Sequence, residues 1–290
     1  MATTKKHLRF GIKTAPQFTT YEDILRVWLE ADALPVMEHA WDFDHFLSLG
    51  KDPTGPCLEG WTLLGALAAR TQRIRIGVMV TGNTYRHPAV LANMAATVDI
   101  ISNGRLDFGI GAGWNVQEHT MYDIPFYTTG ERIRRMGEAC EVIKLLWTEP
   151  VANFEGRYYH LRNALCNPRP VQKPYPPIVI GGGGEKLTLR MVARYANIWN
   201  CNTSTAEEFR HKSEVLDQHC AAIGRDPASI ERSIQWRVQP DDLETTRTAL
   251  RSFIDAGANH LILNLVAPYP EGIVTRLARE VAEPLKAEYE

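Results

Sequence analysis

Eight short apolar runs, separated by longer stretches with helical spacing, constrain the fold of this chain more than any other feature of its sequence. Runs rich in β-branched and aromatic residues predict strands, and their alternation with helical patterns is typical of βα units around a parallel sheet. Helices are expected between them, for example over residues 59–71 and over residues 87–102, where a proline follows the start and Asn103-Gly104 follows the end. The expected strands cover residues 8–14, 34–43, 74–81, 106–113, 177–182, 196–201, 234–238 and 260–266.

Eight strands of this kind predict an α/β protein with a single TIM (β/α)8 barrel over residues 1–290, and the length of 290 residues suits that fold. An open doubly wound sheet is the alternative. The barrel is favoured because polar or glycine-rich residues follow many different strands, and only in a barrel do all those strand ends meet at one mouth. These residues are Asp42 to His45, Thr81 to Asn83, Gly113 to Asn115, Gly181 to Gly184, and Asn200.

The stretch from Val151 to Pro177 interrupts the alternation. Its first part, "NFEGRYYHL", predicts a hairpin that turns at Glu155-Gly156. Its second part, "NPRPVQKPYPP", has too many prolines for a helix or a central strand. We therefore expect an insertion that crosses one face of the barrel.

Charge and cysteine content exclude several classes of function. The formal net charge is −2 and the basic residues are scattered, which argues against nucleic acid or membrane partners and favours a small molecule. The first residues, "MATTKKHLRFGI", lack an apolar signal core, and no run approaches the roughly 18 apolar residues of a membrane span. The five cysteines are widely spaced without a Cys-x-x-Cys motif, so we expect reduced thiols, no metal site and a cytoplasmic protein.

Four consecutive glycines, Gly181 to Gly184, lie between an expected strand and an amphipathic stretch in "IVIGGGGEKLTLRMVARYANIWN" (178–200). We expect the following helix to begin near Glu185. Free amide groups and the positive end of the helix dipole attract an anion there, and glycines let it approach closely. The segment therefore predicts a phosphate site, with a tight flexible turn as the alternative.

Alternate glycines also occur in "GIGAGWN" (109–115). The pattern differs from a dinucleotide-binding fingerprint because Trp114 stands at its end and the strand lies a third of the way along the chain. Such glycines let a backbone lie near a flat ring or within a crowded barrel interior. Asn115 would then offer a donor and an acceptor at the mouth.

Polar residues at other strand ends leave two interpretations open. His45, in "DFDHF" (42–46), either lies in a solvated turn or binds a cofactor and transfers a proton near neutral pH. Glu59 is either the acid of a first helical turn or part of the site, and "TGNTYRHP" (81–88) is either a polar loop or part of the pocket. Since nucleophile elbows and P-loops are missing from the sequence, we expect a flat, phosphate-bearing cofactor to carry the chemistry.

Two long segments, "TQRIRIGVMVTGNTYRHPAVLANMAATVDIISNGRLDFGIGAGWNVQEH" (71–119) and "NPRPVQKPYPPIVIGGGGEKLTLRMVARYANIWN" (167–200), resemble the luciferase-like monooxygenase superfamily. Within it, the chain resembles the branch of oxidoreductases that use coenzyme F420, a 5-deazaflavin. The resemblance covers roughly Leu8 to Asn200. It implies a TIM barrel with an insertion, a deazaflavin or flavin across the mouth, and a homodimer.

The resemblance also implies positions for the cofactor. The ring would pack over a bulge at the end of the third strand, around Val80-Thr81-Gly82, often with a non-prolyl cis peptide. His45 would lie beside the ring, and the glycine turn would hold the phosphate of the ribityl chain. The implied cofactor-binding residues are His45, Val80, Thr81, Asn83, Asn115, Gly181, Gly182, Gly183 and Gly184.

The function implied by the resemblance is hydride transfer between C5 of the deazaflavin and a small organic substrate. His45 is the first candidate for handling the proton, with Glu59 and Glu118 as further catalytic candidates. The first alternative is an FMN-dependent monooxygenase, in which the reduced flavin activates oxygen. The second is a non-catalytic flavin-binding protein, because a barrel does not guarantee chemistry.

Three segments are expected to determine the substrate. They are residues 47–57, the hairpin near Tyr158 and Tyr159, and the loop that follows Val266. Their aromatic and proline-rich composition suits the wall of a pocket for a moderately apolar molecule, although it also suits ordinary surface loops or a dimer contact.

Overall fold

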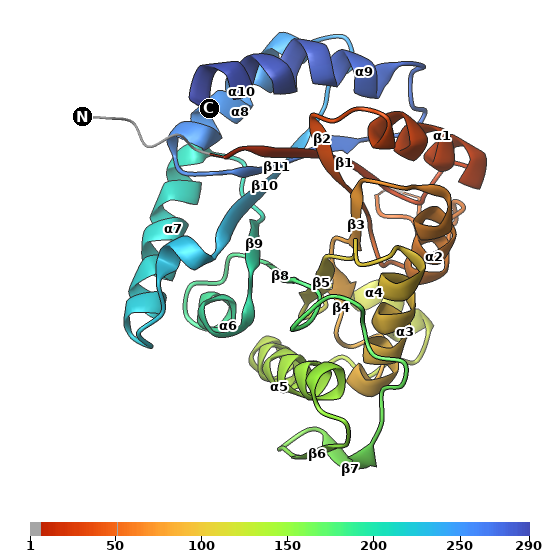
Figure 1. The fold of residues 1–290 in the computed structure, drawn as a ribbon, viewed down its shortest axis with the longest axis vertical. Coiled ribbons are helices and arrows are strands. Elements are labelled where there is room, and N and C mark those ends of the chain that lie inside the picture. The colour runs from red at the N-terminus through yellow and green to blue at the C-terminus, as the bar shows by residue number, and fades with distance from the viewer. Residues whose placement is uncertain (1–6, 51) are drawn as a thin grey trace.

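The expected parallel barrel is present in the computed structural model, which describes residues 7–50 and 52–290 (Figure 1). Residues 1–6, which belong to the segment without a signal core, and Lys51, which belongs to the expected specificity segment 47–57, lie outside the described residues. Nine strands form one sheet in the order β3-β2-β1-β11-β10-β9-β8-β5-β4, and each paired neighbour runs parallel. The strands are β1 (Arg9–Thr14), β2 (Met37–Asp42), β3 (Arg75–Val78), β4 (Thr81–Gly82), β5 (Phe108–Gly111), β8 (Ile178–Gly181), β9 (Ile198–Cys201), β10 (Glu231–Arg237) and β11 (His260–Leu265).

The third position in the barrel is shared by two strands. β3 pairs with β2, whereas β4 pairs with β5, so the single strand expected over residues 74–81 is wrong as one element. The barrel closes between β3 and the chain leading into β5, where the amide of Ile76 donates to the carbonyl of Arg105 at 2.9 Å and the amide of Asp107 donates to Ile76 at 2.8 Å. The other seven expected strands are confirmed, with ends that differ by a few residues.

Helices surround the barrel, and their ends follow the signals in the sequence. The helix expected over 59–71 is α2, with Glu59 as its N-cap, and the helix expected over 87–102 is α3, followed by Asn103 and Gly104 with φ of 54° and 80°. The helices are α1 (Tyr21–Asp32), α2 (Gly60–Arg70), α3 (Pro88–Ile101), α4 (Val116–Met121), α5 (Thr129–Thr148), α6 (Thr188–Tyr195), α7 (Ala206–Ala221), α8 (Leu243–Asp255), α9 (Ile273–Leu277) and α10 (Glu283–Tyr289). Among the described residues, none of these helices is both long and apolar enough to cross a membrane.

The insertion forms the expected hairpin, with β6 (Ala152–Glu155) and β7 (His160–Ala164) antiparallel. It lies outside the barrel beside α5 (Figure 1). Glu138 of α5 accepts hydrogen bonds from the amides of Arg157 and Tyr158 at 2.9 and 2.8 Å. The proline-rich stretch then returns past the end of α3, where Asp99 accepts from the amide of Val171 at 2.8 Å. The insertion therefore packs on the outer helical layer.

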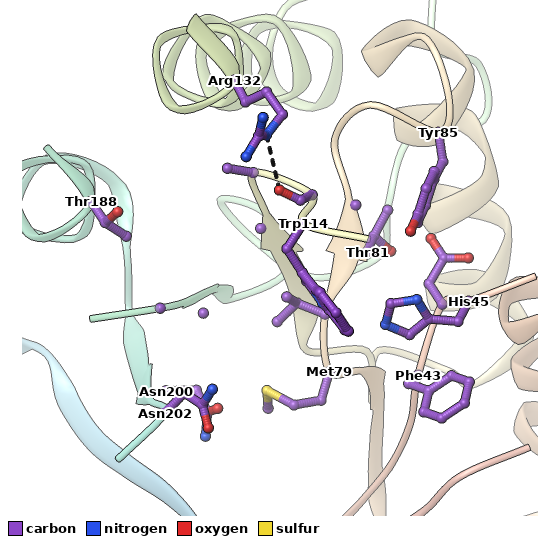
Figure 2. A pocket seen from close by; sticks show the side chains of 18 of the residues that line it. Phe43, His45, Met79, Thr81, Tyr85, Trp114, Arg132, Thr188, Asn200 and Asn202 are labelled. Carbon is purple, nitrogen blue, oxygen red and sulfur yellow. Dashed lines mark hydrogen bonds between the residues drawn. The ribbon is translucent and has the colours of Figure 1, made fainter. Parts of the chain in front are cut away.

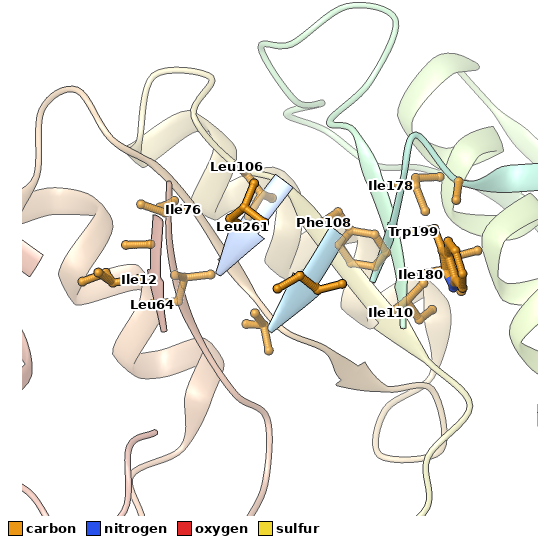
Figure 3. Packing of buried hydrophobic residues seen from close by; sticks show 14 of the residues in the cluster. Ile12, Leu64, Ile76, Leu106, Phe108, Ile110, Ile178, Ile180, Trp199 and Leu261 are labelled. Carbon is orange, nitrogen blue, oxygen red and sulfur yellow. The ribbon is translucent and has the colours of Figure 1, made fainter. Parts of the chain in front are cut away.

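The core has two parts, because successive residues of a strand point to opposite faces of the sheet. On β8, Ile178 and Ile180 pack in the large cluster that also contains helical residues such as Leu64, so these side chains face outward. Val179 between them packs in a small cluster with residues such as Ile262, inside the barrel. Figure 3 shows part of the outer cluster, which fixes the strands against the helices.

Candidate active site

One pocket of about 450 Å³ opens where the strand ends converge (Figure 2). Its walls come from the ends of β1, β2, β4, β5, β8, β9 and β10 and from the first turns of α5 and α6. The pocket therefore lies at the mouth of the barrel, where the polar residues that follow the strands were expected to meet. The residues singled out in the sequence that line it include Asp44, His45, Val80, Thr81, Gly82, Gly113, Trp114, Gly181, Gly182 and Asn200.

One wall of the pocket is formed where the chain leaves β3. The Met79–Val80 peptide bond is cis, one residue before the segment 80–82 that the resemblance implied. Thr81 then begins β4, and its hydroxyl accepts a hydrogen bond from the indole nitrogen of Trp61 at 2.7 Å. Both side chains are buried, so α2 holds this wall in place.

The alternate glycines of β5 make room for this neighbouring segment. A Cβ on Gly109 would lie 1.9 Å from the carbonyl oxygen of Val78, and a Cβ on Gly111 would lie 2.7 Å from a methyl group of Val80. Gly181 faces the same valine, since its Cβ would lie 3.1 Å from it. Of the two interpretations of these glycines, the crowded interior therefore explains Gly109, and the two glycines beside Val80 shape the pocket wall.

The turn after β8 consists of Gly181 to Gly184, and we call it the glycine cradle. Gly181 and Gly182 line the pocket, and Gly182 has a φ of 119°, a conformation that side-chain-bearing residues rarely adopt. The amide of Gly182 donates to the carbonyl of Asn200 at 3.0 Å, and its own carbonyl accepts from the indole of Trp199 at 2.7 Å. Gly183 and Gly184 continue the turn but are not among the pocket residues.

The helix after the turn begins at Thr188, so the expected start near Glu185 is wrong by three residues. Residues 185–187 form a turn first, and no side chain caps the first amides of α6. Thr188 lines the pocket. The amide of Leu189 donates to the carbonyl of Gly184 at 3.0 Å, so the start of α6 is tied to the glycine turn. The positive end of the helix dipole lies there and favours an anion.

Arg132 adds a cation on the same side of the pocket (Figure 2). It comes from the first turns of α5, and its guanidinium donates to the carbonyl of Gly113 at 3.1 Å and to that of Tyr127. Among the described residues, no carboxylate lies within ion-pair distance of it. Arg132 and the start of α6 together give this end of the pocket a positive potential, away from His45.

His45 and Glu118 form a buried pair at the other end. His45 is 9% exposed and lines the pocket, and its Nδ1 lies 2.8 Å from a carboxylate oxygen of Glu118, which is fully buried. Glu118 also accepts from the amides of Phe46 and Leu47 at 2.7 and 3.1 Å and from the hydroxyl of Tyr85. Burial alone would raise the pKa of Glu118, but the hydrogen bonds from His45, Tyr85 and Leu47 together hold it below its usual value.

The ionised carboxylate fixes the tautomer of His45. A carboxylate can only accept, so Nδ1 of His45 carries a proton toward it. Nε2 is then the ring nitrogen available to a ligand in the pocket, as an acceptor when the ring is neutral. Glu118 itself is not among the pocket residues, so it is a positioning residue for His45.

Glu59, a further catalytic candidate, caps α2 and lies outside the pocket lining. Its carboxylate accepts from the amides of Trp61 and Thr62 at the start of α2, and it pairs with Arg86 at 2.5 Å. Arg86 also pairs with Asp44 at 2.6 Å. Burial raises the pKa of Asp44, although Arg86 opposes that shift. The cluster fixes the loop that presents His45, and Glu59 does not line the pocket.

The two asparagines predicted to bind cofactor also cap or brace the chain. Asn115 is the N-cap of α4, where its side-chain oxygen accepts from the amides of Gln117 and Glu118, and it thereby positions Glu118. The amide of Asn83 donates to the hydroxyl of Tyr159 at 3.2 Å. Neither asparagine is among the pocket residues, and neither is the hairpin tyrosine.

Several pocket residues were missed in the sequence. They include Lys13, Arg132, Thr188 and Gln235. Lys13 is a polar residue near the carboxyl end of the strand expected over 8–14, which is a signal the sequence offered, whereas Gln235 lies near the start of the strand expected over 234–238. Arg132 and Thr188 lie in helices whose starts depend on the tertiary structure, so only the fold brings them to the mouth.

A parallel barrel with a pocket and a buried His–Glu pair at its mouth is the arrangement of the α/β-barrel enzymes, which place their active sites at this end. Residues 9–287 match the luciferase-like monooxygenase family, and the chain belongs to that family. It is an enzyme of the oxidoreductase type, like the named relatives that follow.

Two relatives with assigned names are F420-dependent glucose-6-phosphate dehydrogenases. That of Microbacterium testaceum is 33% identical over 248 residues, which cover 83% of this chain and 72% of the relative. That of Kineococcus radiotolerans is 32% identical over 220 residues, which cover 73% of this chain and 64% of the relative. An uncharacterised protein of Mycobacterium bovis is 31% identical over 196 residues, 68% of each chain.

Solved structures share the fold. An F420-dependent secondary alcohol dehydrogenase, solved with an F420-acetone adduct, superposes with a TM-score of 0.85 at 18% identity, covering 95% of this chain and 98% of its own. A monooxygenase from Streptomyces bottropensis superposes with a TM-score of 0.77 at 22% identity, covering 98% of this chain and all of its own. These likenesses support the barrel and do not distinguish between cofactors.

Proposed function

We propose that this protein is an F420-dependent oxidoreductase that transfers a hydride between C5 of the deazaflavin and a small organic substrate. The observation that carries the proposal is one pocket with an anion-binding end at Gly182, Thr188 and Arg132 and a buried proton-handling pair, His45 and Glu118, at the other end. The relatives named as F420-dependent support the choice of deazaflavin.

The residues present fit such a cofactor. A Cβ at Gly182 would project into the cradle and lie 3.3 Å from the methyl group of Thr188, so glycine keeps this end open for a phosphate. The Met79–Val80 segment and Trp114 line the pocket between the cradle and His45 and would hold a flat ring. When bound, the deazaflavin supplies a carbon that accepts or donates a hydride.

His45 completes the reaction by moving a proton. In the oxidation of an alcohol or amine, neutral Nε2 takes the proton from the substrate oxygen or nitrogen, and in the reverse reaction the protonated ring returns it. Glu118 keeps Nδ1 protonated and stabilises the cationic ring that forms. The low exposure of His45 limits competition by water for Nε2.

The first test is a pair of titrations of the cofactor-free protein with F420 and with FMN, following the fluorescence of each compound. We expect F420 to bind with micromolar or lower Kd and FMN to bind at least about tenfold more weakly. A preference for FMN would replace this proposal with an oxygen-using monooxygenase. Binding of neither compound would contradict the assignment of the cradle.

The Gly182→Ala variant should weaken F420 binding by about tenfold or more, because alanine at a φ of 119° is strained and its methyl group narrows the cradle. The same titration measures the effect. Gly183→Ala is the matched control, since its Cβ would meet only the flexible side chain of Lys212 at 3.1 Å. Equal losses in both variants would mean that the turn is sensitive to any methyl group and would not support a phosphate cradle at Gly182.

The homodimer, the small-molecule substrate and the cytoplasmic location remain predictions. We propose that they follow the pattern of the family, and sedimentation of the purified chain would test the dimer. A single species with the mass of one chain would contradict it.

A further inference from the structure

A second cavity of about 220 Å³ lies beside the main pocket. Lys13, Phe43 and Leu49 line both cavities, so they lie at the junction between them. The side cavity is bordered mainly by apolar groups, including Leu265 and Val266 at the end of β11 and in the loop that follows it. Two of the three segments expected to determine the substrate, 47–57 and the loop after Val266, therefore contribute to this cavity.

Lys13 is the cation at that junction. Its ammonium group donates to the side-chain oxygen of Gln235 at 2.8 Å, and no carboxylate within residues 7–50 and 52–290 lies at ion-pair distance from it. Desolvation lowers the pKa of Lys13 to about 8, and the negative charge of Asp42 opposes that shift. The group is thus mostly protonated at pH 7, yet its charge has no neutralising partner in contact.

The orientation of Gln235 is fixed by a directional chain of hydrogen bonds. Its amide nitrogen donates to the oxygen of Asn200 at 2.7 Å, the amide nitrogen of Asn200 donates to the hydroxyl of Ser233 at 2.9 Å, and that hydroxyl lies 2.8 Å from Nδ1 of His260. Turning Gln235 around would place its amide donors against Lys13 and break this chain. Gln235 therefore uses one of the three ammonium hydrogens and leaves two for a ligand.

We propose that Lys13 binds the carboxylate of a small apolar acid, that the hydrocarbon part of this acid occupies the side cavity, and that such a carboxylate-bearing compound is the substrate of the enzyme. The proposal deepens the F420-dependent function, on which it rests for the reaction. A carboxylate satisfies both free hydrogens and forms a direct ion pair, which Asp42 does not form, whereas a neutral amide or alcohol of the same size satisfies only the hydrogen bonds. The anion-binding end at Arg132 remains free for the cofactor.

Calorimetric titration of the 290-residue chain with hexanoate and with hexanamide tests this, with and without F420 bound. We expect hexanoate to bind at least about tenfold more tightly than hexanamide, and Lys13→Met to weaken hexanoate by about 10- to 100-fold with little effect on hexanamide. Lys13→Arg keeps the charge and should retain most of the preference. Lys173→Met, which removes a charge from an exposed position in the proline-rich stretch, is the matched control and should leave both affinities unchanged.

Other results of these titrations would overturn either the carboxylate inference or the proposed F420-dependent function. Equal binding of hexanoate and hexanamide by the unaltered protein, or a preference that survives in Lys13→Met, would overturn the inference even if F420 binds. A Lys13→Met variant that loses F420 itself would assign Lys13 to the cofactor and also overturn it. Failure of the unaltered protein to bind F420, with the carboxylate preference intact, would instead count against the proposed function alone.

Discussion

Replacing His45 with alanine is expected to lower kcat by about 10²- to 10⁴-fold, which is the usual contribution of a positioned general acid or base. The expectation follows from the pair that it forms with Glu118 at 2.8 Å and from its place in the pocket wall. Binding of F420 should change much less, because the cradle lies at the opposite end. The measurement is the rate of F420 reduction with a substrate found by screening small alcohols, amines and carboxylates.

A matched control comes from another histidine at the end of a loop. His87 is exposed and caps α3 through its Nδ1, and His87→Asn preserves a capping side chain while removing an imidazole. We expect its kcat to be unchanged. A His45→Ala variant that turns over at the normal rate, or one that loses F420 in proportion to its activity, would contradict a role for His45 in proton transfer.

Glu118→Gln separates positioning from chemistry. The amide nitrogen of glutamine would face two donors, Nδ1 of His45 and the hydroxyl of Tyr85, so His45 would move its proton to Nε2 and present a donor to the pocket. The variant should therefore lose activity in the direction that needs a base and show an altered pH profile of kcat. A merely structural role for Glu118 would lower stability and leave that profile as it was.

Most of the barrel could be predicted because its strands are short and buried on both faces, so they appear in the sequence as apolar runs. End signals agreed with several helix boundaries, as Asn103-Gly104 after α3 illustrates, whereas the expected start of α6 was wrong by three residues. The division of the third strand into β3 and β4 could not be predicted in the same way. It depends on pairing with two different neighbours, and no turn signal within residues 74–81 marks the break.

The sequence predicted those residues of the candidate site that have a recognisable pattern in their immediate neighbours. The glycine turn and His45 at a strand end have local signals, and both line the pocket. Asn115 and Glu59 were harder to interpret, because a polar residue before a helix serves equally as an N-cap or as a ligand, and here both are caps. Glu118 was a catalytic candidate, but its role as the partner of His45 depends on a contact across 73 positions of sequence.

The last expected result concerns the wall behind the cofactor pocket. Gly109→Ala should prevent folding or cost about 4 kcal/mol or more of unfolding free energy. A methyl group at this position would lie 1.9 Å from the carbonyl oxygen of Val78, which belongs to the backbone of β3 and cannot rotate away. Thermal and urea unfolding, together with the yield of soluble protein, measure the effect.

Gly65→Ala gives the opposite expectation and serves as the control. Gly65 lies in the middle of α2, where a Cβ meets nothing within 4 Å, so alanine should stabilise the protein by roughly 0.5 to 1 kcal/mol. Stability that is equal in the two variants would contradict the close packing of β5 against β3. Because Val78 directly precedes Met79 and Val80, which line the pocket, the same packing fixes the wall against which a flat cofactor would lie. A Gly109→Ala protein that does fold should therefore bind F420 more weakly, whereas Gly65→Ala should bind it with unchanged affinity.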